Sequence, residues 1–169
     1  MWGNACGYVW GRQDLRIEVS IANVHDRQSY YGALDIFNGQ FLLRAYPKAD
    51  SHYTVLFMRY LQRCRPDQQL LIFWDGASYH RQKEMRDFLQ QINGDRPPEQ
   101  WKVICFPLAP YASQENPVED VWLKGKTFVR KQALSAICFT QIKQLFVKGI
   151  RQEKFFDFPK LNQYLFSYE

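Results

Sequence analysis

The sequence predicts an α/β fold, and three patterns indicate it. An unbroken apolar run from Leu70 to Trp74 is typical of a strand that is buried on both faces of a mostly parallel sheet. Alternating apolar residues at 16–22 indicate a half-buried strand, and helical spacing at 85–92 indicates a helix. With 169 residues, 46% of them hydrophobic, the chain can build one sizeable core, so one domain is expected.

A hairpin and a capped helix are predicted between the strand at 16–22 and the apolar run. The segments 29–37 and 40–46 flank Asn38-Gly39, a dipeptide that favours a tight hairpin turn. Asp50 or Ser51 then offers a side-chain oxygen to the start of a helix, which ends near the next proline.

A helix and a short strand are predicted after the apolar run. The helix contains Met85 and Ile92 and stops at Asn93-Gly94. The strand covers 103–106 and includes Cys105, which we interpret as a core residue.

Asp75 is the first candidate functional residue, because it follows the apolar strand directly. Ligands of open α/β sheets bind at the carboxyl ends of the strands, which favours a functional carboxylate at this position. The alternative is that Asp75-Gly76 only starts a turn. Both interpretations stay open on position alone.

Glu119 is the second candidate, and it also has two interpretations. Asn116 fits the N-cap of a helix, Pro117 the first helical position and Glu119 the third, which together make a capping arrangement. A carboxylate in a first helical turn has few rotamers, so it can also be aimed at a metal ion. The capping and metal-binding roles are compatible.

Two motifs carry a resemblance to a known family. The segment Asp75-Gly76-Ala77-Ser78-Tyr79-His80 resembles the Asp-Asn-Ala-x-x-His signature of mariner-related bacterial insertion-sequence transposases. The segment 106–122 resembles that family's Leu-Pro-x-Tyr-Ser-Pro-x-Leu-Asn-Pro-Ile-Glu-x-x-Trp block. The resemblance extends through 7–11 and 30–35, so it covers most of the chain up to about Lys131. Gly76 departs from it, since asparagine is usual there.

The resemblance implies a ribonuclease H-like mixed sheet flanked by helices. It also implies three carboxylates that hold two Mg²⁺ ions, with Mn²⁺ as a substitute, for cutting and joining DNA strands. By motif, Asp75 is the second carboxylate and Glu119 the third. His80 and Asn116 are candidates for contacts around the metal site; alternatively, His80 helps to start the following helix.

By the same resemblance, the first carboxylate lies on an opening strand upstream of 7–10. We therefore expect a chain whose first strand is missing and which is inactive or nearly so alone. Asp14, Asp26 and Asp35 are candidate substitutes, and Asp35 is the best because it lies on a predicted strand. Its place before the hairpin turn favours a role at the strand end instead.

The charge pattern is compatible with DNA as the partner. The net charge is +5, and basic residues outnumber acidic ones from Val121 onward. The candidate DNA-binding residues are Lys124, Lys126, Arg130 and Lys131. Such charges also occur on merely solvated helix faces. By analogy, the complete transposase is expected to be a homodimer that binds transposon ends and target DNA.

We expect residues 1–131 to form the truncated catalytic domain and 132–169 a basic, aromatic helical extension of it. The aromatic residues of this extension either stack on bases or, as we prefer, pack on the core. They are Phe146, Phe155, Phe156, Phe158, Tyr164 and Phe166.

Two absent sequence patterns bear on the cellular location of the protein and on the role of its cysteines. We see neither a signal peptide nor an apolar stretch that could span a bilayer, so a cytoplasmic protein is expected. The four cysteines have no Cys-x-x-Cys spacing, and neither a zinc site nor a disulfide framework is suggested.

Three functions remain open on the sequence. The first is part of a cut-and-paste transposase that cleaves and transfers DNA strands in the complete protein. The second is a catalytically inactive DNA-binding or dimerising fragment that competes with the full-length enzyme. The third is a nuclease of the same fold that uses Asp35 in place of the missing carboxylate.

Overall fold

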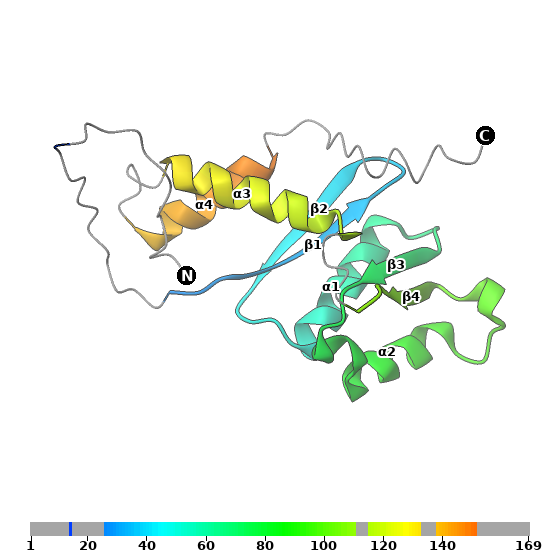
Figure 1. Ribbon diagram of the computed structural model, residues 1–169. Coiled ribbons are helices and arrows are strands. Elements are labelled where there is room, and N and C mark those ends of the chain that lie inside the picture. Colours follow the sequence, from blue (N-terminus) through cyan, green and yellow to red (C-terminus); the bar gives the residue numbers. More distant parts are fainter. Residues whose placement is uncertain (1–13, 15–25, 111–114, 133–137, 152–169) are drawn as a thin grey trace. The chain divides into compact units, whose positions relative to one another are not determined.

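A computed structural model of the chain describes residues 14, 26–110, 115–132 and 138–151 (Figure 1). These residues belong to two compact units. One unit lies within Ser29–Asp120, and the other includes 121–132 and 138–151. The strand predicted at 16–22 lies outside the described residues.

The predicted hairpin is confirmed. β1 (Ser29–Asp35) pairs antiparallel with β2 (Gln40–Tyr46). Gly39 has a φ of +59°, in the left-handed region that glycine adopts without a steric cost. β1 ends two residues earlier than predicted, because the Asp35 carboxylate accepts hydrogen bonds from two backbone N–H groups of the turn.

α1 (Ser51–Cys64) begins at the predicted cap. The Asp50 carboxylate accepts a hydrogen bond from the backbone N–H of Tyr53 at 2.9 Å, which satisfies an N–H group that has no partner within the helix. The Tyr31 hydroxyl of β1 donates to the carbonyl oxygen of Asp50 at 2.9 Å and accepts from its N–H at 3.0 Å. The cap therefore also fixes α1 to the hairpin.

α2 (Lys83–Asn93) ends at Gly94, as predicted, where φ is +60°. The buried Asn93 side chain donates to the carbonyl oxygen of Val103 at 2.9 Å and accepts from the N–H groups of Lys102 and Val103. Because its amide finds partners for both its oxygen and its nitrogen, Asn93 can be buried without a large penalty. It ties the end of α2 to the next strand.

β3 (Leu70–Trp74) and β4 (Val103–Pro107) pair in parallel. The prediction that β3 is buried on both faces is wrong in this structure, because Leu71 is 53% exposed and Phe73 is 62% exposed. The intervening residues of β3 pack against the core that α1 and α2 supply. Both helices therefore cover the same face of β3, and its other face stays accessible.

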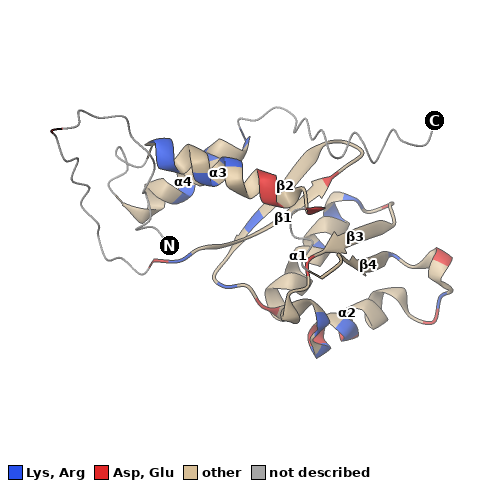
Figure 2. Ribbon diagram, in the orientation of Figure 1, with Lys and Arg blue, Asp and Glu red and all other residues tan. Residues whose placement is uncertain are grey.

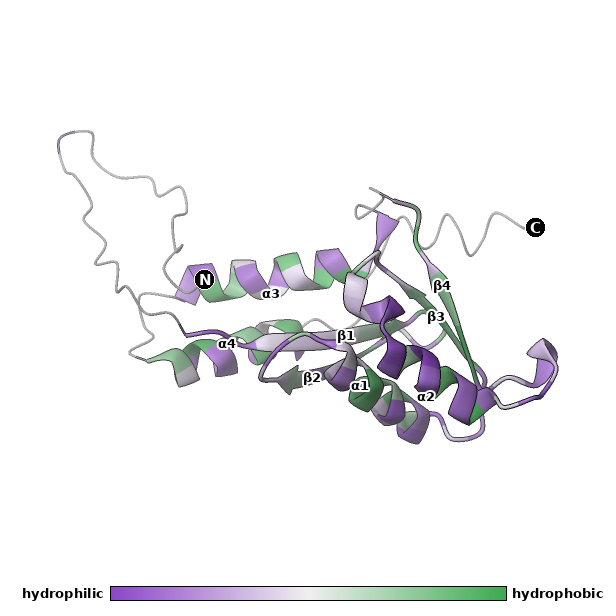
Figure 3. Cartoon of the chain, turned by 90° about the horizontal axis from the view of Figure 1, so that it is seen from below, coloured by the Kyte–Doolittle hydropathy of each residue, from purple (hydrophilic) through white to green (hydrophobic). Residues whose placement is uncertain are grey.

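The core of this unit is built by the hairpin, α1 and α2. Its six buried side chains are Tyr31, Phe57, Met58, Leu61, Met85 and Phe88. The half-buried Cys105 packs against them, which agrees with its predicted place in the core, and burial raises the pKa of its thiol to about 12. Figure 3 shows β3 and β4 as largely hydrophobic strands beside the more hydrophilic α2.

The described strands form two separate two-stranded sheets, β1–β2 and β3–β4. Antiparallel and parallel pairing thus occur together with the four α-helices of the described residues, which confirms the α/β class. Each described strand has one edge along which no other described strand is hydrogen-bonded.

The second unit contains α4 (Phe139–Arg151) and most of α3 (Val118–Gln132). The two helices approach closely at two glycines. A Cβ atom at Gly125 would lie 2.8 Å from the Phe146 ring, and one at Gly149 would lie 2.6 Å from Phe128. The contact spans the predicted border at residue 131 and needs residues without side chains at these two points.

An aromatic pair adds to this contact. Trp122 stacks on Phe146 with the ring centroids 6.1 Å apart. Phe146 thus packs on α3 rather than on the core of the first unit, and the other aromatic residues named for the extension lie outside the described residues. No described helix is both long and apolar enough to cross a membrane.

Candidate active site

Asp75 follows β3 at the carboxyl end of the parallel pair. The backbone N–H of Leu108, just after β4, donates to the carbonyl oxygen of Trp74 at 2.8 Å, so the chain leaves both strands at the same edge. This is the edge at which open α/β sheets bind ligands. The structure therefore gives Asp75 the position in the sheet that the sequence predicted.

The turn predicted at Asp75 is also present. Oδ1 of Asp75 accepts a hydrogen bond from the N–H of Ala77 at 3.0 Å. Oδ2 has no hydrogen-bond partner among the described residues, and the side chain is 52% exposed. The turn occupies one carboxylate oxygen and leaves the other available, so the structural and functional interpretations of Asp75 are compatible.

His80 lies beside Asp75. It belongs to a short 3₁₀ helix, η1 (Ser78–Arg81), and its Nε2 lies 3.2 Å from Oδ1 of Asp75. The ring is 12% exposed and stacks on Trp74, with centroids 4.5 Å apart and planes 11° apart. Burial lowers the pKa of His80, and the opposing effect of Asp75 is smaller.

These contacts decide between the two interpretations of the histidine. The α2 helix that follows has Gln82 as its N-cap and no side-chain cap hydrogen bond. The His80 side chain therefore does not cap α2, and it reaches back to Asp75 instead. The histidine ring stacks on Trp74, which was predicted only as a strand residue. The aromatic residue directly before Asp75 is the sequence feature that indicates this contact.

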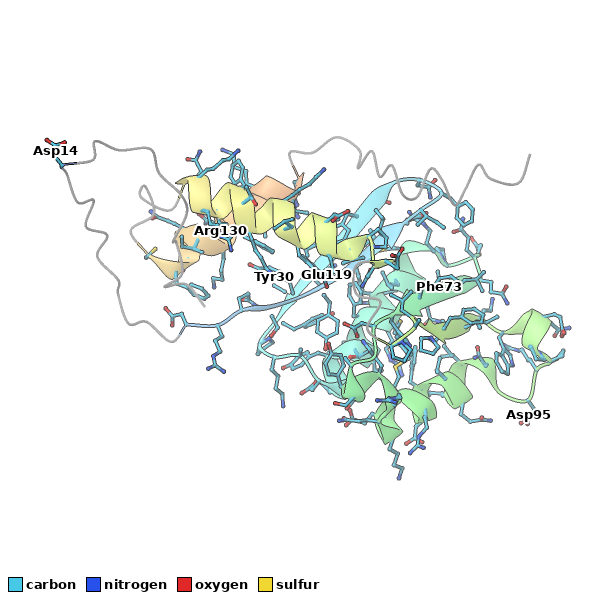
Figure 4. The ribbon with its side chains drawn as sticks, viewed as in Figure 1. Asp14, Tyr30, Phe73, Asp95, Glu119 and Arg130 are labelled. Carbon is cyan, nitrogen blue, oxygen red and sulfur yellow. The ribbon has the colours of Figure 1, made fainter. Side chains whose placement is uncertain are left out.

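Glu119 lies in the first turn of α3, where Figure 4 labels it. Oδ1 of Asn116 accepts a hydrogen bond from the N–H of Val118 at 3.2 Å, and the carbonyl oxygen of Asn116 accepts from the N–H of Glu119 at 3.0 Å. The predicted side-chain cap by Asn116 is thus confirmed, whereas α3 begins at Val118, one residue later than predicted. The exposed Glu119 carboxylate has no hydrogen-bond or ion-pair partner in the described part of the chain.

Asp35 is engaged by other groups. Its carboxylate accepts hydrogen bonds from Nε and Nη2 of Arg65 at 3.1 and 2.8 Å, and from Nδ2 of Asn38 at 2.8 Å. Partial burial is the largest single influence and raises the pKa of Asp35, but the hydrogen bonds from Asn38 and Arg65 together outweigh it and lower that pKa. Its oxygens stabilise the hairpin, so Asp35 is a poor metal ligand. Asp26 and Asp14 are exposed residues before β1.

The available carboxylates suit a hard divalent cation, for which oxygen ligands are preferred. Asp75 offers one unpaired oxygen, and Glu119 offers two. Among the described residues, no group of three or more His, Cys, Asp or Glu side chains is arranged to hold a metal ion. The structure brings Asp75 together with His80, and Glu119 together with Asn116.

The candidate DNA-binding residues follow Glu119 along α3. Lys126, Arg130 and Lys131 are exposed, and Lys124 is half-buried. Figure 2 shows acidic residues at the start of α3 and basic ones farther along it and on α4. The basic residues of α4 are Lys143, Lys148 and Arg151. These three residues were not among the predicted DNA-binding residues.

Comparison with known proteins identifies the family of the chain. A family model described as DDE superfamily endonuclease matches residues 3–143. No curated protein matches the chain.

Proposed function

Because the chain belongs to the DDE superfamily endonucleases, we propose that it is the catalytic region of a DNA transposase related to the mariner-like insertion-sequence enzymes. One observation carries the proposal. A carboxylate at the carboxyl end of a parallel strand pair, Asp75, is held through one oxygen and keeps the other unpaired. A carboxylate used only for a turn would not need the additional support of His80.

We further propose that Asp75 and Glu119 are the ligands of the catalytic metal. Members of this family generally use divalent metal ions, and Mg²⁺, with Mn²⁺ as a substitute, fits two carboxylates best. When bound, such ions polarise the phosphodiester and activate the attacking water or 3′ hydroxyl. Asp75 supplies Oδ2, and Glu119 supplies a carboxylate whose backbone is fixed by the Asn116 cap. By supporting that cap, Asn116 contributes indirectly.

The proposal extends to the substrate. Lys124, Lys126, Arg130 and Lys131 would neutralise phosphates of the transposon end, an interaction that weakens as salt rises. Transposition joins two ends to one target, which favours a homodimer of the complete protein. The division into a catalytic region at 1–131 and a basic extension at 132–169 is part of this proposal.

The proposal is tested by measuring Mn²⁺ binding to the full chain by electron paramagnetic resonance. Glu119→Gln is expected to weaken binding by about tenfold or more, because it removes one ligand charge. Asp120→Asn is the matched control: it removes an equally exposed negative charge one position away on the same helix turn. Equal affinities for the two variants would contradict the assignment of Glu119.

The alternative function is a DNA-binding or dimerising role that competes with a complete transposase. Such a role needs no metal ion. DNA binding that persists in a chelator, together with no nicking of supercoiled DNA in Mg²⁺ or Mn²⁺, would favour this role. The engaged state of Asp35 argues against the third function, a nuclease that uses this residue.

A further inference from the structure

The histidine next to Asp75, His80, has two ring nitrogens that differ in their hydrogen-bond partners. Nε2 of His80 lies within hydrogen-bond distance of Oδ1 of Asp75. Nδ1 is buried and has no hydrogen-bond partner in the described structure. A carboxylate oxygen is an acceptor only, so the proton belongs on Nε2.

The surroundings of the ring leave Nε2 as the nitrogen that can donate. Nδ1 has no acceptor in the described structure, and a buried N–H group without an acceptor is costly. The ring therefore carries a proton on Nε2 and presents one donor to Asp75.

Two contacts hold this donor in place. The ring lies almost parallel to Trp74, 4.5 Å away, so its plane is fixed by stacking. The backbone of His80 is held by a hydrogen bond from its N–H to the carbonyl oxygen of Ala77 at 3.1 Å. Ala77 in turn donates to Oδ1 of Asp75. Within the segment Trp74–His80, both Ala77 and His80 therefore face Oδ1 of the Asp75 carboxylate.

We propose that His80 is a positioning residue that, stacked on Trp74, holds Oδ1 of Asp75 and directs Oδ2 toward the bound ligand. Two donors on Oδ1, from Ala77 and His80, stop the carboxylate from rotating. The inference rests on the proposed function, because the ligand of Oδ2 is the metal ion proposed above.

Two variants of His80 separate the contribution of its N–H donor from that of its aromatic ring. His80→Phe keeps an aromatic ring for Trp74 and removes the donor. His80→Gln removes the ring and keeps an N–H₂ group at about the distance of Nε2. If the donor positions Asp75, the Phe variant should bind Mn²⁺ about tenfold more weakly than the original chain, and the Gln variant should bind within about threefold of it. Equal losses in both variants, or none in the Phe variant, would overturn the proposal.

Two further measurements on the full chain need no metal. Nitrogen-15 NMR of the histidine rings should show a proton on Nε2 of His80; a ring that carries its proton on Nδ1 alone would refute the inference. The amide of Ala77 should exchange with solvent severalfold faster in His80→Phe than in His80→Gln, because it depends on the orientation of Asp75.

These measurements also separate this inference from the proposed function. If the chain binds no Mn²⁺, the assigned metal site fails, while the ring tautomer and the Ala77 exchange still decide the role of His80. If the chain binds Mn²⁺ and the ring has the other tautomer, the metal site stands and the positioning role fails.

Discussion

Two turns of this molecule each begin with an aspartate, but the two aspartates have different side-chain partners. Asp35 is the last residue of β1 and Asp75 directly follows β3, and each accepts a hydrogen bond from the backbone N–H two residues later. Asp35 then receives two hydrogen bonds from the Arg65 guanidinium and is 17% exposed, whereas Asp75 lies beside Nε2 of His80 and is 52% exposed. In this chain, the strand-end aspartate that a guanidinium neutralises is structural, and the one beside a histidine keeps one oxygen without a partner among the described residues.

The largest effect is expected when the carboxylates of Asp75 and Asp35 are each replaced by an amide. Asp75→Asn should lower the Mn²⁺ affinity of the chain by about 100-fold, because it removes a ligand rather than a supporting contact. The turn should survive, since the amide oxygen can still accept from Ala77. Asp35→Asn should leave Mn²⁺ affinity unchanged. Calorimetric titration of both variants checks this, and a loss of affinity in Asp35→Asn would reverse the roles of the two turns.

Removal of the Arg65 guanidinium should weaken the turn that Asp35 forms after β1. Arg65→Met is expected to lower the free energy of unfolding by about 2 kcal/mol, because Asp35 keeps its charge but loses its strongest hydrogen bonds. Urea denaturation at neutral pH measures the loss. Arg63→Met, which changes the neighbouring arginine of α1, is the matched control and should have a much smaller effect.

The effect of Arg65 should also depend on pH. The folded pKa of Asp35 is lowered, so its contribution to stability is complete above the ordinary aspartate pKa of 3.8 and is lost as pH falls through the lowered folded value. The difference in unfolding free energy between the original chain and Arg65→Met should therefore narrow as the solution is acidified through this range. A difference that does not depend on pH would show that Arg65 acts by packing alone.

The smallest effects concern the glycines of the two turns. Gly39 has a φ of +59°, so Gly39→Ala should destabilise the chain by about 1 kcal/mol. Gly76 does not have a positive φ, and a Cβ there would meet nothing within 4 Å. Gly76→Ala and Gly76→Asn should therefore be neutral or stabilise by a few tenths of a kcal/mol. Thermal unfolding of the three variants tests this, and a loss at Gly76 as large as that at Gly39 would contradict it.

The sequence by itself determined the features that depend on a few neighbouring residues. Asn38-Gly39 places the hairpin turn, Asp50 and Asn116 cap their helices, and Gly94 ends α2, because each uses hydrogen bonds or dihedral angles within about four residues. The motif match also supplied Asp75 and Glu119 as candidates before any geometry was known.

Only the tertiary structure decided which carboxylate is neutralised and which strand face is covered. Arg65 reaches Asp35 across 30 residues of sequence, and Asn93 binds the start of β4, so no local pattern records either contact. Leu71 and Phe73 have the composition of buried residues, yet they lie opposite the face that α1 and α2 cover. The stacking of His80 on Trp74 depends on how the turn folds back. Burial and partner choice are set by packing between distant segments, which residue type alone does not specify.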